Sequence, residues 1–558
     1  MERFENNEPE VNEMLVYSGE GLRTHINSVL EGIKNERDLV QELHSYIEAK
    51  NDRKVCCLYG LRRTGKTTIM LQEIQKINDC DKCLLIECGK DTTVMQLRKT
   101  IEAYPEAKYV FVDEITKAVN FIDTASVFSN KYAAEGKKVV LTGTDSLGFY
   151  FAKSDELFDR AHFIHTTFIP FKEYHSLLGK GILDYIRYGG TLSPENVFYN
   201  RDASNEYSNS AIVFNIIHSL EKWNQGRNFG VLEDLVESGD LPTFINKVIE
   251  YDSRLFLAKI INKEFCSHDL GSLLDLMTKS GVADPDIIYP QGASGAELRK
   301  EMQERIRFFL NIKNSTLLAD EYNVNAIIQY LKELDVLYEL SRIDSKIPEY
   351  IFTQPGMRYS QATDLARALV TSEVFSEGYS VSEQEAILEK LEQDICGGIL
   401  EDIILYQTIK SLEQSNDKFL VSKYQQLATG KEFDVFIANF TKKQACIIEV
   451  KLSDKADAHQ VRHLTDKDIC KAFESKIGTK IVSKAVVYNG ENRFNPFKAN
   501  VPSDRVVYLN AKDYLIHCSR LAKELTASAI TDRKQYRKAM KNAGIKLPNQ
   551  EGGIGFTD

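Results

Sequence analysis

The residues from Gly60 to Thr67 read GLRRTGKT and match the spacing GxxxxGK[ST]. They follow the apolar run KVCCLYG and precede a helical pattern, which is the context that makes this motif informative. Its glycines let backbone amides close around phosphate oxygens at a helix N-terminus. Lys66 would reach the β- and γ-phosphates of a nucleotide, and the Thr67 hydroxyl would ligate Mg²⁺. The residues expected to bind ATP here are Gly60, Leu61, Arg62, Arg63, Thr64, Gly65, Lys66, Thr67 and Thr68.

A second set of candidate residues ends the apolar run YVFVDE (109–114). We expect Asp113 to lie near the Mg²⁺ shell and Glu114 to orient or deprotonate an attacking water. The alternative, that both carboxylates cap a strand in solvent, is less compatible with the upstream phosphate-binding motif. Another strand, KVVLTGTDS, brings Thr144 to the same edge of the sheet, where it either senses the γ-phosphate or caps the next helix.

Three further charged residues interrupt an apolar hairpin pattern in FDVFIANF and ACIIEVKL. Asp434 and Glu449 are equidistant from the midpoint of the polar turn, so a symmetric turn would set them opposite each other with Cβ atoms about 5 Å apart. Lys451 would share their face because side chains alternate along a strand. A divalent cation would relieve the repulsion between the carboxylates, and the lysine could hold or activate water for attack on phosphorus. The pattern predicts a Mg²⁺ site, with Mn²⁺ as a substitute, at Asp434 and Glu449.

Two other residues are weaker candidates for this metal site. Glu401, in the helical pattern GGILEDIILYQ, would add a third metal-binding carboxylate, and Gln460 would orient substrate or water. The alternative is a surface ion pair between Glu449 and Lys451, because E-x-K on a strand is a frequent chance match. The apolar residues that flank each charge favour the metal site.

The elements that must position these residues alternate between strands and helices. The segment LVQELHSYIEAKN (39–51) has helical spacing, and strands are expected near CLLIEC, YVFVDE and KVVLTG. This alternation predicts an α/β fold in which a parallel sheet carries helices on both faces. The charged hairpin would belong to a second α/β domain that begins with the helix ILEDIILYQTIKSLEQ and includes the strands KAVVYNG and DRVVYLN.

A chain of 558 residues is too long for a single hydrophobic core. Between the two α/β domains we expect a winged-helix-like unit, with a short helix (LADEY), a longer helix (NVNAIIQYLKELDV) and two strands (LYELSR and EYIFTQ). Its longer helix sets Lys332 against Glu333 and Asp335, which favours packing against protein over reading DNA. The expected divisions are an N-terminal segment (1–35), a P-loop domain (36–180), a helical region (181–300), the winged-helix-like unit (301–360), a second α/β domain (375–515) and a basic tail (516–558).

Charge, cysteine content and hydrophobicity narrow the classes of protein to which this chain could belong. The net charge of −11 argues against a protein that coats nucleic acid by bulk electrostatics. The basic stretch DRKQYRKAMKNAGIK (532–546) is interpreted as a solvated helix face. The ten cysteines show one CxxC, at Cys80 and Cys83, without a second pair, so no zinc site is assigned. No apolar run is long enough for a membrane helix and the N-terminus is acidic, so we expect a cytoplasmic protein without a membrane partner.

Several motifs together resemble a prokaryotic family of AAA-superfamily ATPases. They are GLRRTGKTT, FVDEITK, LTGTDS, FDRAHFIHTTFIPFKEY, YGG and QPGMRY, in this order. In that family a winged-helix linker and a restriction-endonuclease-like domain usually follow the ATPase, and the spacing of Asp434, Glu449 and Lys451 is similar to the PD-(D/E)XK nuclease signature. The family's Leu-x-Gly-Arg element corresponds to Leu157–Arg160, with Asp159 in place of Gly. The resemblance implies that Arg160 could reach a nucleotide in cis or in trans, although it could also be a surface arginine.

Two functional hypotheses follow from this resemblance. In the first, an ATPase gates a metal-dependent nuclease that acts on nucleic acid, with DNA preferred to RNA, in defence against foreign DNA or in genome maintenance. In the second, the protein is an ATP-driven switch whose nuclease-like domain is inactive and binds nucleic acid or protein. A homo-oligomer is expected if Arg160 acts in trans.

Overall fold

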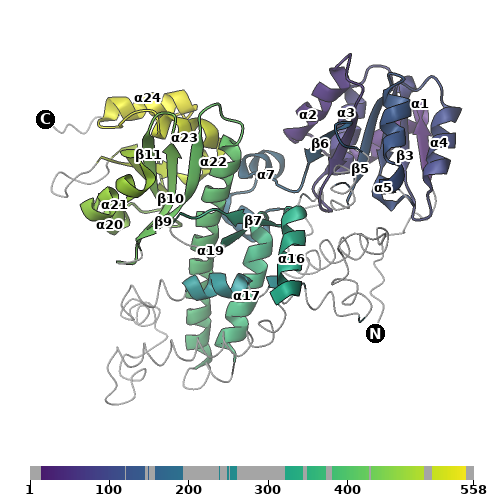
Figure 1. The fold of residues 1–558 in the computed structure, drawn as a ribbon. Coiled ribbons are helices and arrows are strands. Elements are labelled where there is room, and N and C mark those ends of the chain that lie inside the picture. Colours follow the sequence, from purple (N-terminus) through teal and green to yellow (C-terminus); the bar gives the residue numbers. More distant parts are fainter. Residues whose placement is uncertain are drawn as a thin grey trace.

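The computed structural model describes residues 14–119, 121–144, 149, 157–190, 192, 238, 245, 248–249, 252–260, 321–343, 349–372, 380–426, 429–494 and 505–547. Within these ranges the chain is an α/β protein with two six-stranded sheets and one two-stranded hairpin. Figure 1 shows the two sheets on opposite sides of the molecule, with α7 (Phe171–Leu178) between them. The long helix α19 (Val381–Leu412) runs down from the second sheet.

The first sheet is parallel except for one edge strand. Its order is β1-β3-β4-β5-β2-β6, and only β1 runs antiparallel to its neighbour among the described strands. After β2 the chain crosses over β5 and β4 to form β3, and it then returns through β4 and β5. Because these strands are parallel, the carboxyl ends of β2, β4 and β5 lie at one edge of the sheet. Ligands bind in such sheets at this edge, where the strand order reverses. The strands are β1 (Leu15–Ser18), β2 (Val55–Tyr59), β3 (Cys83–Glu87), β4 (Tyr109–Asp113), β5 (Lys138–Gly143) and β6 (Ala161–His165).

Helices cover both faces of this sheet, which is why its central strands are apolar throughout rather than alternating. One face packs against α1 (Gly19–Val29), α2 (Leu39–Glu48) and α3 (Lys66–Lys76). The other packs against α4 (Val94–Ala103), the short α5 (Phe121–Thr124) and a π-helical turn (Phe128–Ala133). Short 3₁₀ turns lie at Cys80–Lys82 and Ile115–Lys117. The expected parallel sheet with helices on both faces is confirmed.

The second sheet is mixed, in the order β13-β14-β12-β11-β10-β9. Strands β9, β10 and β11 form an antiparallel meander, whereas β12 and β14 run parallel to β11. In the hairpin, Val435 pairs with Ile448 and Asn439 with Gln444, which is the register of the symmetric turn expected from the sequence. The strands are β9 (Phe419–Gln426), β10 (Lys431–Asn439), β11 (Gln444–Lys451), β12 (Lys480–Tyr488), β13 (Arg493–Phe494) and β14 (Val506–Asn510).

Two groups of helices cover this sheet. On one face lie α19, α22 (Ala511–Ile516), α23 (Cys518–Leu525) and α24 (Arg533–Ala543). On the other lie α20 (Arg462–Thr465) and α21 (Lys467–Ile477), which follow a 3₁₀ turn at Ala458–Val461. The basic stretch expected to be a solvated face is α24, whose Tyr536 and Met540 are buried while Arg533, Lys534 and Arg537 are exposed.

Helix α19 is longer than the sequence predicted. The helix expected to begin with ILEDIILYQ instead starts at Val381 and runs through Gly397 and Gly398 to Leu412. A Cβ at Gly398 would lie 3.1 Å from the Phe256 ring and 3.2 Å from Ile260. The glycine therefore makes room for a packed neighbour, which offsets its lower helix propensity.

The middle of the chain forms a small hairpin unit packed on long helices. It consists of α16 (Glu321–Glu333) and the antiparallel strands β7 (Leu337–Leu340) and β8 (Glu349–Phe352). Glu321 and Tyr322 of LADEY begin α16 rather than ending a separate helix; the rest of that expected helix lies outside the described residues. Helix α17 (Pro355–Val370) follows the hairpin and packs on α8 (Ile182–Tyr188) and α19.

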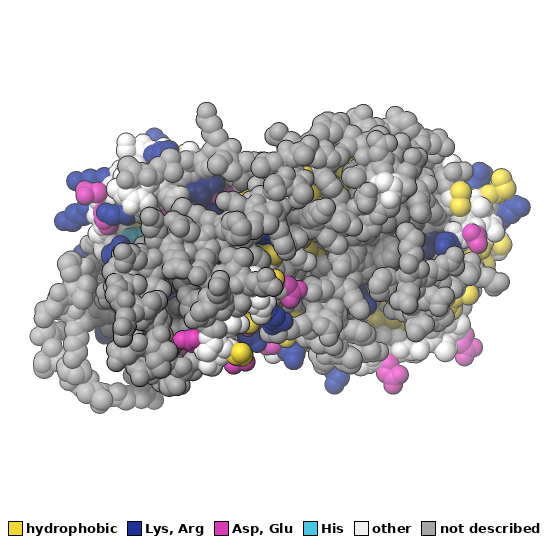
Figure 2. All heavy atoms as spheres, turned by 90° about the horizontal axis from the view of Figure 1, so that it is seen from below, with side chains coloured by type: hydrophobic (Ala, Val, Ile, Leu, Met, Phe, Trp, Pro, Cys, Tyr) yellow, Lys and Arg dark blue, Asp and Glu magenta, His cyan; other side chains and the backbone are white. Residues whose placement is uncertain are grey.

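Two surface features of the described residues bear on possible partners. On the face seen in Figure 2, the visible acidic and basic side chains of the described residues are interspersed. Across the described ranges, no helix is both long enough and apolar enough to cross a membrane.

Candidate functional site

The phosphate-binding loop joins β2 to α3 and has the backbone that its glycines predict. Gly60 has φ +149° and Gly65 has φ +85°, conformations that other residues rarely adopt. A Cβ at Gly60 would lie 2.4 Å from Oγ1 of Thr166, so only glycine fits there. Gly65 directly precedes Lys66, the first residue of α3, so the loop leads into a helix N-terminus.

Lys66 is buried at the centre of this loop. Its Nζ donates to the carbonyl oxygens of Gly60 (2.9 Å) and Leu61 (2.8 Å). Burial lowers the pKa of Lys66 to about 8, although the nearby carboxylates of Glu114 and Asp113 oppose this shift. The ammonium is therefore held in the loop by backbone carbonyls, from which it can turn to an entering phosphate.

Asp113 and Thr67 meet as a pair of oxygen donors. Thr67 Oγ1 donates to Asp113 Oδ2 at 2.8 Å, and Thr142 Oγ1 donates to the other carboxylate oxygen. Burial raises the pKa of Asp113, as does Glu114, against the two hydroxyl donors. A hydroxyl and a carboxylate in contact are the oxygen ligands that Mg²⁺ prefers, so these residues fit that ion.

Glu114 follows Asp113 with a left-handed backbone, at φ +53°. Its amide donates to Asp113 Oδ1 at 3.0 Å, and its Oε2 accepts from Thr144 Oγ1 at 3.1 Å. The structure thus brings Thr144 to the carboxylate at the end of β4. The alternative role of Thr144 as a helix cap concerns residues 145–148, which lie outside the described residues.

The other expected nucleotide-binding residues occupy the rim of the loop. Arg62 and Arg63 are exposed, and Thr68 is half-buried in the first turn of α3. Arg63 has φ +61°, and its carbonyl oxygen accepts from the amide of Leu192 at 2.8 Å.

Arg37 is a buried residue that sequence reasoning missed. Its Nη1 donates to the carbonyl oxygens of Thr64 (2.8 Å) and Thr166 (2.9 Å), and its Nη2 donates to that of Phe168 at 3.0 Å. Its Nε donates to Glu173 Oε2 at 2.7 Å. One guanidinium therefore joins the phosphate-binding loop to the segment after β6. A single arginine before a helix gives little signal in the sequence, because its partners lie more than a hundred positions away, except for Thr64.

Arg160 lies at the amino ends of the strands, whereas the phosphate-binding loop lies at their carboxyl ends. It is exposed just before β6, where its carbonyl oxygen accepts from Val55 at the start of β2. The loop begins at the other end of β2, five residues and roughly 15 Å away. This separation disfavours a role for Arg160 in cis, so a role in trans stays a prediction. Asp159 has φ +54°, in the left-handed region that favours glycine, and pairs with Lys54 at 2.6 Å.

Leu61 connects the loop to the hairpin unit. Its side chain is fully buried in a cluster with residues of α16, β7, β8 and α17, among them Leu331, Leu337 and Phe352. Its amide donates to Thr167 Oγ1 at 3.2 Å, and that hydroxyl is 3.0 Å from His165 Nε2. The same imidazole approaches Asp335, with Nδ1 to Oδ2 at 3.5 Å. Two routes thus lead from the P-loop into the hairpin unit.

The second candidate site lies in the hairpin of the second sheet. Asp434 and Glu449 are both buried, and Lys451 Nζ lies 2.8 Å from Glu449 Oε1 and 3.8 Å from Asp434 Oδ2. The amide of Val450 donates to Asp434 Oδ2 at 2.8 Å. The structure therefore brings the three residues together on one face, as the register requires. Two adjacent carboxylates suit a hard cation such as Mg²⁺, which often takes only one or two protein carboxylates.

The two weaker candidates do not join this group. Among the residues that the structure describes, no three His, Cys, Asp or Glu side chains gather as a metal site would require. Glu401, half-buried on α19, instead contributes to the field around Lys423, and α19 covers the other face of the sheet. The amide of Gln460 holds the preceding loop, accepting from Asp457 N and donating to the carbonyl oxygen of Lys455. Glu401 as a third metal ligand is therefore not supported by this geometry.

Comparisons with known proteins address the first site. A family model described as an AAA domain matches residues 52–175. No curated protein matches the chain. Among solved structures, the S. cerevisiae Hsp104–ADP complex matches with a TM-score of 0.23 and 12% identity, over 70% of this chain and 61% of that chain. This chain thus spans about three fifths of the length of that one, and the similarity is too low to bear on its function. Together, the family match and the geometry at Lys66, Thr67 and Asp113 identify the N-terminal region as a P-loop ATPase domain of the AAA type.

Proposed function

We propose that this AAA-type protein hydrolyses ATP and that its nucleotide state gates a metal-dependent nuclease of the PD-(D/E)XK type, acting on nucleic acid with DNA preferred. The single observation that carries the nuclease is the contact of Lys451 with both Glu449 and Asp434 in a buried hairpin. A nuclease built on these three residues would serve either defence against foreign DNA or genome maintenance. The nuclease domain of this proposal spans residues 375–515.

On the ATP side, the chain's own residues divide the work. Lys66 leaves the carbonyl oxygens of the loop for the β- and γ-phosphates, and Thr67 with Asp113 would hold Mg²⁺, which neutralises phosphate charge when bound. Glu114 accepts the proton of the attacking water. Thr144, now bonded to Glu114, would be released toward the γ-phosphate as Glu114 turns to the water.

On the nuclease side, Asp434 and Glu449 would hold Mg²⁺ or Mn²⁺, which polarises a phosphate and its water when bound. Lys451 is well placed to hold that water, because its ammonium already lies between the carboxylates. Glu449 and Lys451 are two residues apart on one strand, so they keep this relation without help from a loop.

A second function is favoured by a different observation. Among the described residues, no group of three His, Cys, Asp or Glu side chains that could hold a metal ion forms, and Lys451 already compensates part of the charge of the two carboxylates. With a net charge of −11, this supports an ATP-driven switch whose nuclease-like domain is inactive and binds a partner.

The experiment that separates these functions is a cleavage assay on plasmid DNA, single-stranded DNA and RNA, with Mg²⁺ or Mn²⁺ and with or without ATP. Cleavage that requires metal and is lost in Asp434→Asn supports the nuclease. ATP hydrolysis without cleavage under every condition would leave the switch as the better description.

A homo-oligomer is part of the proposal, because the position of Arg160 favours a role on a neighbouring copy over a role in cis. Phe158, two residues before it, exposes 72% of its surface, which is unusual for a large aromatic side chain. Sizing the Glu114→Gln protein with ATP tests this arm. Assembly that is lost in Phe158→Ser would support it, and a monomer at micromolar concentration would exclude it.

A further inference from the structure

The hairpin unit contacts the P-loop on one side and, on the other, the sheet that carries the second candidate site. On one side its core holds Leu61 of the P-loop, as described above. On the other side, the carbonyl oxygen of Ser341, just beyond β7, accepts from Ser422 Oγ of β9 at 2.8 Å. Strand β9 is the neighbour of β10, which carries Asp434. One small unit therefore lies between the nucleotide site and the carboxylate pair.

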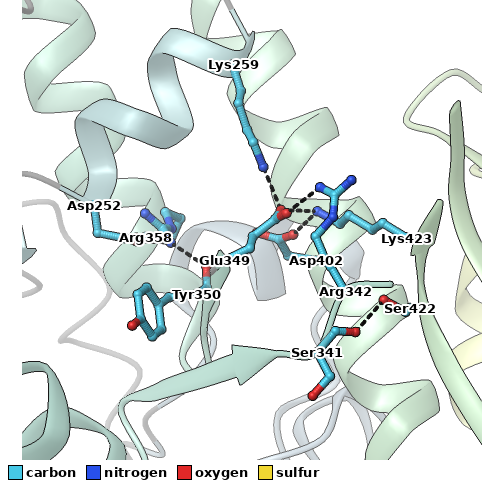
Figure 3. A network of polar contacts seen from close by, with 10 residues as sticks. All are labelled: Asp252, Lys259, Ser341, Arg342, Glu349, Tyr350, Arg358, Asp402, Ser422 and Lys423. Atoms are coloured by element: carbon cyan, nitrogen blue, oxygen red, sulfur yellow. Dashed lines mark hydrogen bonds and ion pairs between the residues drawn. The ribbon is translucent and has the colours of Figure 1, made fainter. Parts of the chain in front are cut away.

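A cluster of charged side chains fastens the hairpin to the second sheet (Figure 3). Glu349, the first residue of β8, lies 2.7 Å from Lys259 Nζ, 2.8 Å from Arg342 Nη1 and 3.1 Å from Lys423 Nζ. Lys423, on β9, also lies 2.9 Å from Asp402 of α19. The Glu349 carboxylate thus binds cations from three separate parts of the chain.

The charge states in this cluster are fixed at ordinary pH. Burial opposes ionisation of Glu349, but Lys423, Lys259 and Arg342 outweigh it and hold the pKa of its carboxyl well below the usual value. Burial also disfavours the ammonium of Lys423, but Asp402, Glu349 and Glu401 raise its pKa above the usual value. The ion pair between β8 and β9 is therefore permanent rather than titrating.

Lys423 stands opposite the part of β10 that carries Asp434. Tyr424 pairs with Phe433 and Ser422 pairs with Phe436, so a bulge sets two β10 residues, Asp434 and Val435, against the single residue Lys423. Bulges bend a strand and re-aim its side chains. A displacement of Lys423 along β9 would therefore act directly on the direction of Asp434.

We propose that Glu349 and Lys423 are positioning residues that transmit the nucleotide state of the P-loop, through the hairpin unit, to Asp434. The inference rests on the proposed nuclease function for its output, but its input rests on the AAA domain alone. Packed cores and ion clusters respond to small shifts by changing between discrete arrangements, which suits them to this task.

ATP would first change the P-loop by drawing Lys66 away from the carbonyl oxygens of the loop. Lys66 holds the carbonyl oxygens of Gly60 and Leu61 in the structure described here. When Lys66 turns to phosphate, the carbonyl oxygens of Gly60 and Leu61 lose this donor, and that of Leu61 is left with the Thr64 hydroxyl at 2.8 Å, so the loop can relax at Leu61. Because the Leu61 side chain is fully buried in one cluster with residues of α16, β7 and β8, we expect its movement to shift the hairpin unit.

The test compares Glu349→Gln with a matched control, each in a Glu114→Gln background that retains ATP. Gln keeps the shape of Glu349 but removes the charge that holds Lys423. The control is Lys431→Gln, which removes the ion pair between Lys431 of β10 and Asp466 and leaves the hairpin contacts intact. Hydrogen exchange of residues 419–439 is measured for each protein with and without ATP.

We expect ATP to change exchange in this segment by about fivefold or more in the parent and in Lys431→Gln, and to leave it unchanged in Glu349→Gln. Binding of a fluorescent ATP analogue should be equal in all three, which a general loss of folding would not allow. Equal ATP effects in Glu349→Gln and the parent, or no ATP effect in the parent, would overturn the inference.

A second readout separates this inference from the proposed function. If the parent cleaves DNA, the ratio of rates with and without ATP should fall to near one in Glu349→Gln while ATP hydrolysis in the otherwise wild-type protein persists. If no protein cleaves, the nuclease proposal fails, but the exchange experiment still decides whether the hairpin unit transmits the nucleotide state.

Should Glu349→Gln unfold because its cations are left without an anion, the double change Glu349→Gln/Lys423→Met removes the opposing charge as well. The same loss of ATP dependence is expected in that protein. An ATP effect that survives in the double variant counts against the proposal as firmly as one that survives in Glu349→Gln.

Discussion

Arg37 and Glu173 form a buried ion pair 2.7 Å long that braces the P-loop from behind. Burial raises the pKa of the Glu173 carboxyl, and Arg37 opposes this shift. The same guanidinium donates to the carbonyl oxygen of Thr64, so it fixes the backbone of the loop from outside the motif. The pair is therefore placed to set the shape of the phosphate site without touching a nucleotide.

We predict that Arg37→Lys weakens ATP binding about tenfold with a much smaller effect on kcat, because lysine keeps the charge but cannot serve four acceptors at once. Arg37→Met should lower the free energy of unfolding by about 3–5 kcal/mol, since it removes the cation beside the buried Glu173 carboxylate. The double change Arg37→Met/Glu173→Gln should recover much of that stability but not the ATP affinity.

The matched control is Lys172→Met, which removes an exposed ion pair with Asp38 next to the same elements. It should cost no more than about 1 kcal/mol and leave ATP affinity intact. Urea unfolding and nucleotide titrations measure both quantities. Unaltered ATP affinity in Arg37→Lys would show that the pair serves stability alone.

For the hydrolytic residues, we predict that Glu114→Gln binds ATP with near wild-type affinity and hydrolyses it at least ~100-fold more slowly, because the amide cannot accept a proton. Lys66→Ala should lose binding and hydrolysis together, since it removes the cation that faces the phosphates. Single-turnover hydrolysis and equilibrium binding distinguish the two. Hydrolysis by Glu114→Gln at the wild-type rate would assign the base to another residue.

Much of the nucleotide site could be predicted because its chemistry is local in sequence. The loop from Gly60 to Thr67 is one short segment between a strand and a helix, so its composition reveals its backbone. The hairpin register was predictable for the same reason, since a short symmetric turn fixes which residues of β10 and β11 oppose each other.

What could not be predicted depends on contacts between distant segments. Arg37 and Leu61 look like ordinary helix-flanking and loop residues until Thr166, Glu173 and the hairpin core meet them in space. The position of Arg160 at the amino ends of the strands follows from the parallel pairing of β6 with β2. That pairing joins segments about a hundred residues apart. The extension of α19 through Gly398 could not be predicted because glycine is found both at helix ends and at sites of close packing, and only the neighbouring Phe256 shows which applies.

Asp335 gives the hairpin unit a predictable pH dependence. Burial raises the pKa of its carboxyl to about 7, with Lys410 opposing and Glu413 adding to the shift, while His165 lies 3.5 Å away. The folded state therefore binds a proton that the unfolded chain releases near pH 4, and stability is lost as pH rises from about 4 to 7. Asp335→Asn should remove this loss, so that its melting temperature exceeds that of wild type most clearly at pH 8.

Thermal melts of wild type, Asp335→Asn and His165→Asn between pH 5 and 8 test this prediction. His165→Asn is the control, because it removes the imidazole that lies 3.5 Å from the Asp335 carboxylate. The prediction fails if Asp335→Asn loses as much stability between pH 5 and 8 as wild type does.

The last prediction concerns the carboxylate pair. Asp434→Asn should change the metal-free stability by less than ~1 kcal/mol, because the amide oxygen can still accept from Val450 N and Lys451 still pairs with Glu449. The same change should abolish the upward shift in melting temperature that Mn²⁺ causes in wild type. Lys451→Ala should behave in the opposite way. Without metal, its two buried carboxylates repel each other and the protein melts at a lower temperature than wild type. Mn²⁺ should then raise the melting temperature by more than in wild type, because no ammonium competes for the carboxylate oxygens. A simple ion pair between Glu449 and Lys451 predicts no Mn²⁺ response in any of the three proteins. A Mn²⁺ titration followed by thermal unfolding, with Lys431→Gln as a control on the same strand, separates these outcomes, and a wild-type protein that does not respond to Mn²⁺ would exclude a metal site in this hairpin.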